Sequence, residues 1–218
     1  MRILFFISVI FVSNIQAQKT NWVLSKNKNG IKIYTRTTEK SPIKEVMGQM
    51  ELNTSLSALV SLVKNAENHH NWIYVNKTAY FIKEVNDFEW YYYNESEAIW
   101  PIANRDIVSQ VKLTQDTTTC AIKINSVGIP DYIGKKEGVV RVLRLASCWD
   151  FIPVRRGVVF VKFKLSIDLG GKLPPWAINL AIDKGPLNTL QAMSKEIKRE
   201  KFKNAKLSFI KEQACIKM

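Results

Sequence analysis

The chain has 218 residues, of which 46% are hydrophobic and 23% are charged. This composition excludes a disordered, collagen-like or coiled-coil protein, and the length suits one domain with its own core. Lysine and arginine number 32 against 19 acidic residues, a net charge of +13. Residues 1–110 carry +2 of this charge and residues 111–218 carry +11. The basic half suits an anionic partner such as a membrane surface, or serves solubility alone.

The first 17 residues have the pattern of a secretory signal peptide. Arg2 precedes an apolar run from Ile3 to Val12, and the small residue Ala17 ends the segment. The run is too short to span a bilayer, which needs about 20 apolar residues. We therefore expect residues 1–17 to be removed and the mature chain to be exported, to a bacterial periplasm or out of the cell.

The sequence offers little material for a metal or redox centre. Three cysteines are too few for a disulfide framework; Cys120 and Cys148 lie in strand-like runs and could form a bridge, and unpaired buried thiols are the favoured alternative. His69 and His70 are adjacent and would diverge on a helix. There is no CxxC, P-loop, GxGxxG or nucleic-acid-reading motif. We expect no metal, no cofactor and no nucleic-acid partner.

The first third of the mature chain reads as two strands and a helix. Trp22–Lys28 is expected to be a turn or short helix that Asn29-Gly30 ends. Alternating apolar and polar residues predict strands over 31–36 and 44–52. Residues 56–67 repeat apolar positions three and four apart, after a Ser/Thr cap, which predicts an amphipathic helix.

About a hundred residues then show strand patterns only, and a long helix follows. The strand-like runs are 78–85, 88–98, 107–113, 119–126, 139–151 and 158–167. Pro174-Pro175 opens a helix that reaches about Lys201, and Gly185-Pro186 interrupts it as a hinge or as a fixed kink. The pattern predicts an α+β fold, in which a curved antiparallel sheet wraps around the long C-terminal helix, followed by a basic tail over 205–218.

A series of landmarks, in order and spacing, resembles the StAR-related lipid-transfer (START) domains. The resemblance covers 22–201, and its landmarks are Trp22, Gly30–Arg36, Lys44-Glu45 with Gly48, Trp72, Trp100-Pro101 with Asn104-Arg105-Asp106-Ile107-Val108, Val140-Arg141, Trp149 with Pro153, and Asp168, Gly170-Gly171, Pro174-Pro175-Trp176 and Asn179. It implies a helix-grip domain over 18–204 with an internal cavity gated by the C-terminal helix. It further implies the binding of one hydrophobic lipid-like ligand, with transfer and sensing of that ligand both left open, and no family-wide catalytic residue. We expect a monomer.

The resemblance and the strand alternation together nominate ligand-binding residues. Alternation over 88–98 places Trp90, Tyr92, Asn94 and Ser96 on one side of a strand. The nominated residues are Trp72, Trp90, Tyr92, Trp100, Arg105, Arg141, Trp149, Phe163, Trp176, Leu180, Leu187 and Leu190.

The two arginines in this set have two interpretations. Arg105 and Arg141 either anchor a ligand head group or form ion pairs within the fold, with Glu95, Glu97 or Asp106 as candidate partners. Sterol-carrying members have a second arginine six residues after Arg105, and this chain has Val111 there. The sterol interpretation is thereby weakened.

An enzyme is the rival function. Related helix-grip proteins include cyclases and aromatases that act on a hydrophobic substrate in the same cavity. Such chemistry needs a positioned acid or base, and only the adjacent pair His69-His70 offers histidine. We therefore expect ligand binding without catalysis.

Overall fold

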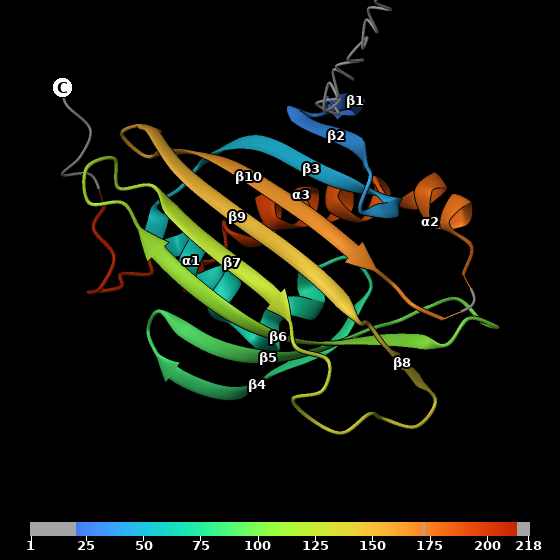
Figure 1. Cartoon of the computed structure of the whole chain (residues 1–218). Helices are drawn as coiled ribbons and strands as arrows, with labels where there is room; N and C mark the ends of the chain where they lie inside the picture. Colours follow the sequence, from blue (N-terminus) through green and yellow to red (C-terminus); the bar gives the residue numbers. More distant parts are fainter. Residues whose placement is uncertain (1–20, 172, 213–218) are drawn as a thin grey trace, which may run out of the picture.

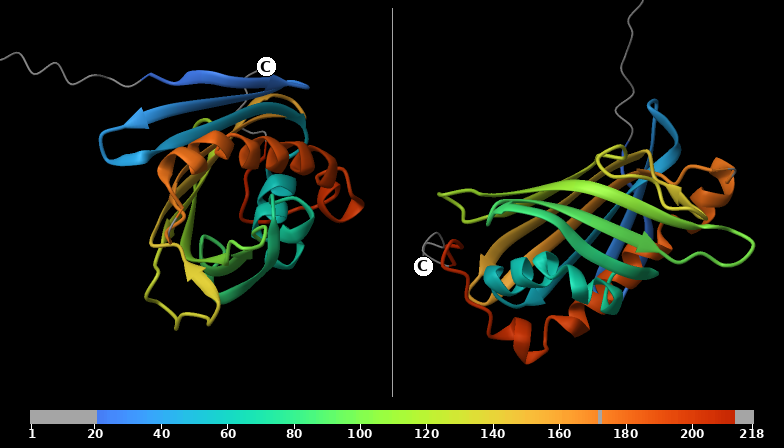
Figure 2. Two further views of the ribbon diagram at one scale, coloured as in Figure 1. Left: turned by 90° about the vertical axis from the view of Figure 1, so that its right-hand side faces the viewer. Right: turned by 90° about the horizontal axis from the view of Figure 1, so that it is seen from below.

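A computed structural model describes residues 21–171 and 173–212 (Figure 1). The predicted signal peptide lies outside these residues. The strands form one sheet in the order β1-β2-β3-β10-β9-β7-β6-β5-β4, and β8 pairs with β6 beside this path. The sheet curls around helices that close its open side (Figure 2). The predicted α+β architecture, a curved sheet gripping C-terminal helices, is confirmed.

The strands are β1 (Val23–Lys28), β2 (Ile31–Thr38), β3 (Ser41–Asn53), β4 (Asn76–Asn86), β5 (Glu89–Ser96), β6 (Asn104–Gln115), β7 (Ile122–Gly128), β8 (Val139–Arg141), β9 (Arg144–Arg155) and β10 (Val158–Asp168). The helices are α1 (Leu56–Lys64), η1 (Ala66–Asn71), α2 (Pro175–Ala181), α3 (Lys184–Glu196) and α4 (Glu200–Lys203). Within the described residues, no helix is long and apolar enough to cross a membrane.

The first element is a strand, and the prediction of a turn or helix for it was wrong. Asn29 and Gly30 both have positive φ angles, 53° and 77°, which form the two-residue turn of a β-hairpin joining β1 to β2. Strand β1 is exposed along most of its length and lies at the edge of the sheet. Strand β1 is held by backbone hydrogen bonds to β2. Because neither of its faces is buried, its sequence has no alternating hydrophobic pattern that would predict a strand.

The run predicted as one strand over 139–151 is broken. Val139–Arg141 is β8, which pairs parallel with β6, and Arg144 begins β9. The backbone N–H of Val142, between the two strands, donates to the Asp106 carbonyl at 2.9 Å. This break changes the alternation, so Arg141 is buried while Leu143 is exposed, although an unbroken strand would give both the same face.

The predicted C-terminal helix consists of three pieces. The break between α2 and α3 falls at Ile182-Asp183, whereas Gly185 and Pro186 lie in the first turn of α3. Proline fits a first helical turn because no intrahelical acceptor awaits its missing N–H. The buried side chains Leu187, Leu190 and Met193 lie on α3.

Gly48 in β3 allows α3 to approach the sheet closely. A Cβ at position 48 would collide with Cδ1 of Leu190 and lie 3.1 Å from Cδ1 of Ile33. Leu190 and Ile33 are both fully buried, so neither has free space to move into.

The edge strand β4 pairs irregularly with β5. The register shifts at three places along the pair, whereas the central pairs β3–β10, β6–β7 and β7–β9 have none. Such bulges are common at sheet edges.

The cysteines differ in state. Cys148 carries a free thiol, and Cys120 takes part in a disulfide. The bridge considered between these two residues is therefore not formed, and Cys120 is not an unpaired thiol.

The chain beyond α4 packs back onto α1. Ser55 caps α1 by accepting a hydrogen bond from the Ala58 N–H at 3.1 Å, as the sequence predicts. Glu212 accepts from the N–H groups of Leu56 at 3.0 Å and Ser57 at 2.7 Å. A carboxylate at this position satisfies free N–H groups of the first turn and interacts favourably with the helix dipole.

Replacing Glu212 by Gln tests this cap. A neutral amide keeps one acceptor oxygen, so we expect the free energy of unfolding to fall by about 1 kcal/mol in chemical denaturation. Glu39→Gln, at an exposed position in the turn between β2 and β3, is the control and should change stability by less than about 0.5 kcal/mol. Equal effects of the two changes would contradict the capping role.

Candidate functional site

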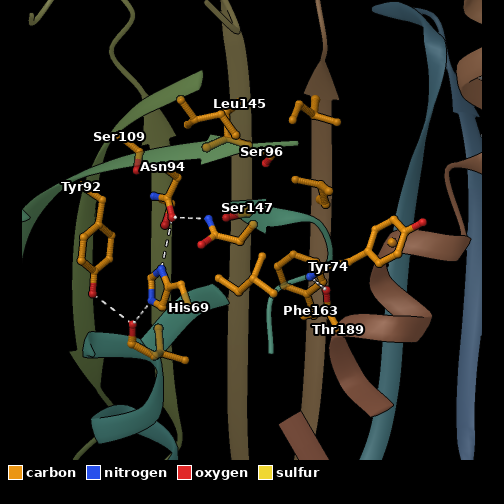
Figure 3. Close-up of a pocket in the computed structure, with 18 of the residues that line it drawn as sticks. His69, Tyr74, Tyr92, Asn94, Ser96, Ser109, Leu145, Ser147, Phe163 and Thr189 are labelled. Carbon is orange, nitrogen blue, oxygen red and sulfur yellow. Dashed lines mark hydrogen bonds between the residues drawn. The ribbon is translucent and has the colours of Figure 1, made fainter. Parts of the chain in front are cut away.

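A cavity of about 240 Å³ lies between the inner face of the sheet and the helices. Strands β4 to β7, β9 and β10 supply the sheet side of its wall, and α1, η1 and α3 supply the helix side (Figure 3). Alternation explains the strand contributions, since Leu145, Ser147 and Trp149 are two residues apart on β9. Phe163, Leu165 and Ile167 repeat this spacing on β10.

Aromatic rings form one part of the wall. Trp149 stacks on Phe163 with ring centroids 4.2 Å apart, and Trp72 lies 5.8 Å from Trp149. The His69 ring contacts Trp72 and Tyr92 edge to face, at 5.6 Å and 5.3 Å. These rings offer a rigid apolar surface at low cost in side-chain entropy.

His69 is held by protein atoms on both sides of its ring. Nε2 lies 2.9 Å from the Val63 carbonyl oxygen and Nδ1 lies 3.1 Å from Oδ1 of Asn94 (Figure 3). Burial lowers the pKa of His69, against a smaller opposite effect of these two hydrogen bonds. The buried Tyr92 hydroxyl lies 3.0 Å from the same Val63 oxygen.

Asn76 and Asn94 place two amides in the wall. The Asn76 Nδ2 atom is 3.4–3.5 Å from three acceptors, the carbonyl oxygens of Thr78 and Glu95 and Oδ1 of Asn94. Because all three are acceptors, the nitrogen must occupy this side of the Asn76 amide. Oδ1 of Asn76 is buried without a hydrogen-bond partner, as is Nε1 of Trp72.

Four serines complete the polar part of the wall. Ser96, Ser109, Ser126 and Ser147 stand on β5, β6, β7 and β9, and Ser126 is directly opposite Ser147. Among the residues that the structure describes, none of these hydroxyls has a hydrogen-bond partner. We call these four residues the serine row. They add open hydrogen-bonding capacity to a wall that is mostly apolar.

The structure brings together four of the nominated residues. Trp72, Tyr92, Trp149 and Phe163 line the cavity. Trp90, Leu187 and Leu190 are buried in the surrounding core without lining it. Trp100, Trp176 and Leu180 are 88%, 68% and 77% exposed.

Arg141 lies outside the cavity and forms a buried ion pair. Its Nε and Nη2 atoms are 2.8 Å and 3.0 Å from the two carboxylate oxygens of Asp106. The same guanidinium donates to the carbonyl oxygens of Pro130, Ile133 and Gly134, which fixes the loop before β8. For Arg141, the structure therefore supports an ion pair within the fold and not an anchor for a ligand head group.

Arg105 also lies outside the cavity and is 8% exposed. Its Nη1 donates to the Ala103 carbonyl oxygen, and its Nε has no partner. Burial lowers the pKa of Arg105. Its guanidinium faces the turn at Gly171, whose φ is 71°. Neither nominated arginine is available as an anchor in the cavity.

A second charged cluster lies on the outer side of β5. Glu95 is 1% exposed and its carboxylate contacts Lys136 at 2.6 Å, Lys77 at 3.3 Å and Asn104 at 3.0 Å. These donors, led by Lys136, hold the pKa of Glu95 at about 2 against an ordinary value of 4.5.

A depressed pKa makes stability depend on pH in one direction. Glu95 contributes its full stabilisation above about pH 4.5 and loses it as pH falls towards 2, because the unfolded chain takes up the proton first. We expect Glu95→Gln to cost about 2–3 kcal/mol at pH 7, with a difference from wild type that shrinks steadily between pH 4.5 and 2. Denaturation curves at several pH values measure this, with the exposed Glu97→Gln as control. A cost that does not vary with pH would contradict the assignment.

A family model described as START domain matches residues 8–202. The chain belongs to the START domain family. The match covers every element from β1 to α3 and confirms the resemblance found in the sequence. The START chain is 26% identical over 173 residues to an uncharacterized protein of Pseudomonas aeruginosa, with 79% of this chain and 85% of the relative covered.

Solved structures agree with this assignment. A STAR-related lipid transfer protein fragment from Xanthomonas axonopodis superposes with a TM-score of 0.77 and 29% identity, over 82% of this chain and 99% of the other. Human StAR-related lipid transfer protein 5 superposes with a TM-score of 0.74 and 17% identity, over 84% and 88% of the two chains, which shows the shared fold. Membership of the START family indicates that the cavity binds a lipid or another hydrophobic molecule.

Proposed function

We propose that this START domain binds one compact hydrophobic molecule in the cavity and carries it between membranes of the compartment to which the chain is exported. The observation that carries the proposal is the aromatic-lined cavity beneath α3. At about 240 Å³ it lies just below the 300–1,000 Å³ typical of small-molecule sites, so a single ring system or short chain fits it.

The lining favours binding without catalysis. It contains no carboxylate, lysine or cysteine, and both nitrogens of its one histidine already contact protein atoms. A general acid or base must reach the substrate with an available proton or lone pair. We propose that the bound molecule leaves chemically unchanged.

The start of α3 is our proposed gate. Gly185 and Pro186 line the cavity, and a Cβ on Gly185 would lie 3.6 Å from the Tyr74 ring. The Tyr74 N–H donates to Oγ1 of Thr189 at 3.1 Å across this contact. Helix α2 is anchored separately, since Asn179 bonds to the backbone of Lys44 and Pro42. Movement at the break between α2 and α3 would open the cavity beside Tyr74 while α2 stays attached.

Two exposed apolar segments form the proposed membrane contact. The loop between β5 and β6 and helix α2 lie at the same end of the sheet (Figures 1 and 2). They expose Ile99, Trp100 and Ile102 on the loop, and Trp176 and Leu180 on the helix. Tryptophan favours the boundary between water and lipid, and the net positive charge of the chain would attract an anionic bilayer.

Export to a periplasm or out of the cell rests on the N-terminal pattern. The disulfide at Cys120 supports it, because disulfides persist in oxidising compartments. N-terminal sequencing of the protein from its host would show a start after Ala17. An intact Met1 would refute the export proposal.

Native mass spectrometry of the protein purified from its host tests the binding function. We expect one added small-molecule mass that survives purification and is recovered unchanged after incubation with the protein. Transfer is then measured between phosphatidylcholine vesicles with and without phosphatidylglycerol. Trp100→Ala with Trp176→Ala should slow transfer, and Gly185→Ala with Pro186→Ala should alter its rate. A protein with no added mass and no uptake from vesicles would refute the proposal.

A further inference from the structure

In the part of the chain that the structure describes, the cavity is lined by no strongly acidic or basic side chain. None of its lining side chains is a lysine, arginine, aspartate or glutamate. Arg141 is fully engaged by Asp106 and three carbonyl groups, and Arg105 lies outside the wall. An ionised group that entered this space would lose its hydration and find no counter-charge, which is strongly unfavourable.

The same wall offers many uncharged hydrogen-bonding groups. The serine row crosses four adjacent strands of the sheet, and Asn94 stands two residues from Ser96 on β5. Ser109 is 3% exposed, so its hydroxyl is hidden from bulk water and has no partner among the described residues. Ser96, Ser126 and Ser147 are half-buried and line the same cavity. Hydroxyls that face a cavity without a protein partner are open to a polar group that arrives with the ligand.

We propose that the cavity selects an uncharged ligand that carries a hydroxyl group, and that the serine row receives this hydroxyl while the aromatic wall holds the apolar body. This inference rests on the proposed binding function and names the class of molecule bound. A hydroxyl matches the row because it both donates and accepts, as each serine does. Phe163, Leu165 and Ile167 line the cavity from the neighbouring strand β10, where Leu165 pairs with Ser147, and suit the apolar remainder of the same molecule.

Probe molecules of similar size and different polarity test the preference for an uncharged ligand separately from the role of its hydroxyl. Naphthalene, a naphthol, a naphthoate and a naphthylmethylammonium differ mainly in one substituent, and their ring system is compact enough for the cavity. Titration calorimetry of each at pH 7 gives four affinities for the wild-type chain. We expect both ions to bind about a hundredfold or more weaker than the naphthol, because the carboxylate must first take up a proton and the ammonium must first lose one to enter without a charge.

The serine row is tested by changing Ser96, Ser109, Ser126 and Ser147 together to alanine. Alanine removes only the hydroxyls, and naphthalene, which has no hydroxyl, is the reference for any change in the cavity itself. We expect the ratio of naphthol to naphthalene affinity to fall about tenfold in this variant. Ser166→Ala, at the adjacent position to Leu165 on the opposite face of β10, is the matched control and should leave the ratio unchanged.

The outcomes are distinct. An unchanged ratio in the four-alanine variant, or an ion that binds as well as the naphthol, would overturn this inference while leaving hydrophobic binding intact. If the wild-type chain binds none of the four probes, including naphthalene, the binding function itself fails and the inference falls with it.

Discussion

Replacing Arg141 by methionine is expected to lower the free energy of unfolding by about 3–5 kcal/mol. The change leaves the Asp106 carboxylate, 1% exposed, without its counter-ion in the interior. It also removes the donors that satisfy the carbonyl oxygens of Ile133 and Gly134. Much of this cost comes from the unpaired charge left behind and not from the attraction of the pair itself.

The matched control is Arg144→Met, three residues further along the chain. Arg144 pairs with Asp168 at 2.8 Å, and its side chain is 65% exposed. Exposed pairs of this kind contribute about 0–1 kcal/mol because water and salt screen them. Chemical denaturation of the two variants measures the difference. Comparable losses for both would show that the buried pair has no special role.

Filling the cavity is expected to abolish binding while the fold is kept. An apolar cavity of about 150 Å³ holds one benzene ring, so a phenylalanine at position 147 would occupy most of the 240 Å³ available. We expect Ser147→Phe to weaken naphthalene binding by about a hundredfold or more. The free energy of unfolding of the empty protein should stay the same or rise, because the new ring fills space.

Calorimetry and thermal unfolding give both quantities for each variant. Ser166→Phe, on the other face of the neighbouring strand β10, is the control that adds the same ring outside the cavity. Ser126→Phe fills the space from β7, should Ser147→Phe fail to fold. Wild-type affinity in both cavity variants would place the ligand elsewhere on the molecule.

The architecture follows from local patterns that the sequence displays openly. Alternation over β10 predicts that Phe163 and Leu165 share the buried face, and Ser55 predicts the start of α1. These signals are local, because a strand or a cap depends on residues a few positions apart. The same holds for the landmarks that identify the START family.

The cavity could be predicted only in part. Tyr92 and Asn94 share a strand face that alternation reveals, and the family resemblance supplies Trp72 and Trp149. The serine row has no such signal. Its members are far apart in sequence and meet only because β5, β6, β7 and β9 are neighbours in the sheet. A small polar residue on a strand is ordinarily assigned to the solvent side.

The strands that the sequence analysis placed wrongly, β1 and β8, depend on their partner strands more than on local patterns. Strand β8 is separate from β9 because it pairs with β6 while β9 pairs with β7 and β10, and its partner residues, such as Asp106 for Arg141, lie 35 positions away in the sequence. Strand β1 depends on its partner β2 and buries little of its own surface. Trp100 and Trp176 are aromatic, yet they are exposed, which hydrophobicity alone does not foresee.

The irregular pairing of β4 has a consequence for how the protein behaves in concentrated solution. An open, straight border of a sheet is a template on which a second chain can add as an extra strand. Here one border, β4, is bent by three bulges and carries Lys83, and the other, β1, is bulged and carries Lys28. Bulges and lysines at both borders disfavour the addition of a second chain as an extra strand, so we expect little amyloid-like stacking in crowded solution.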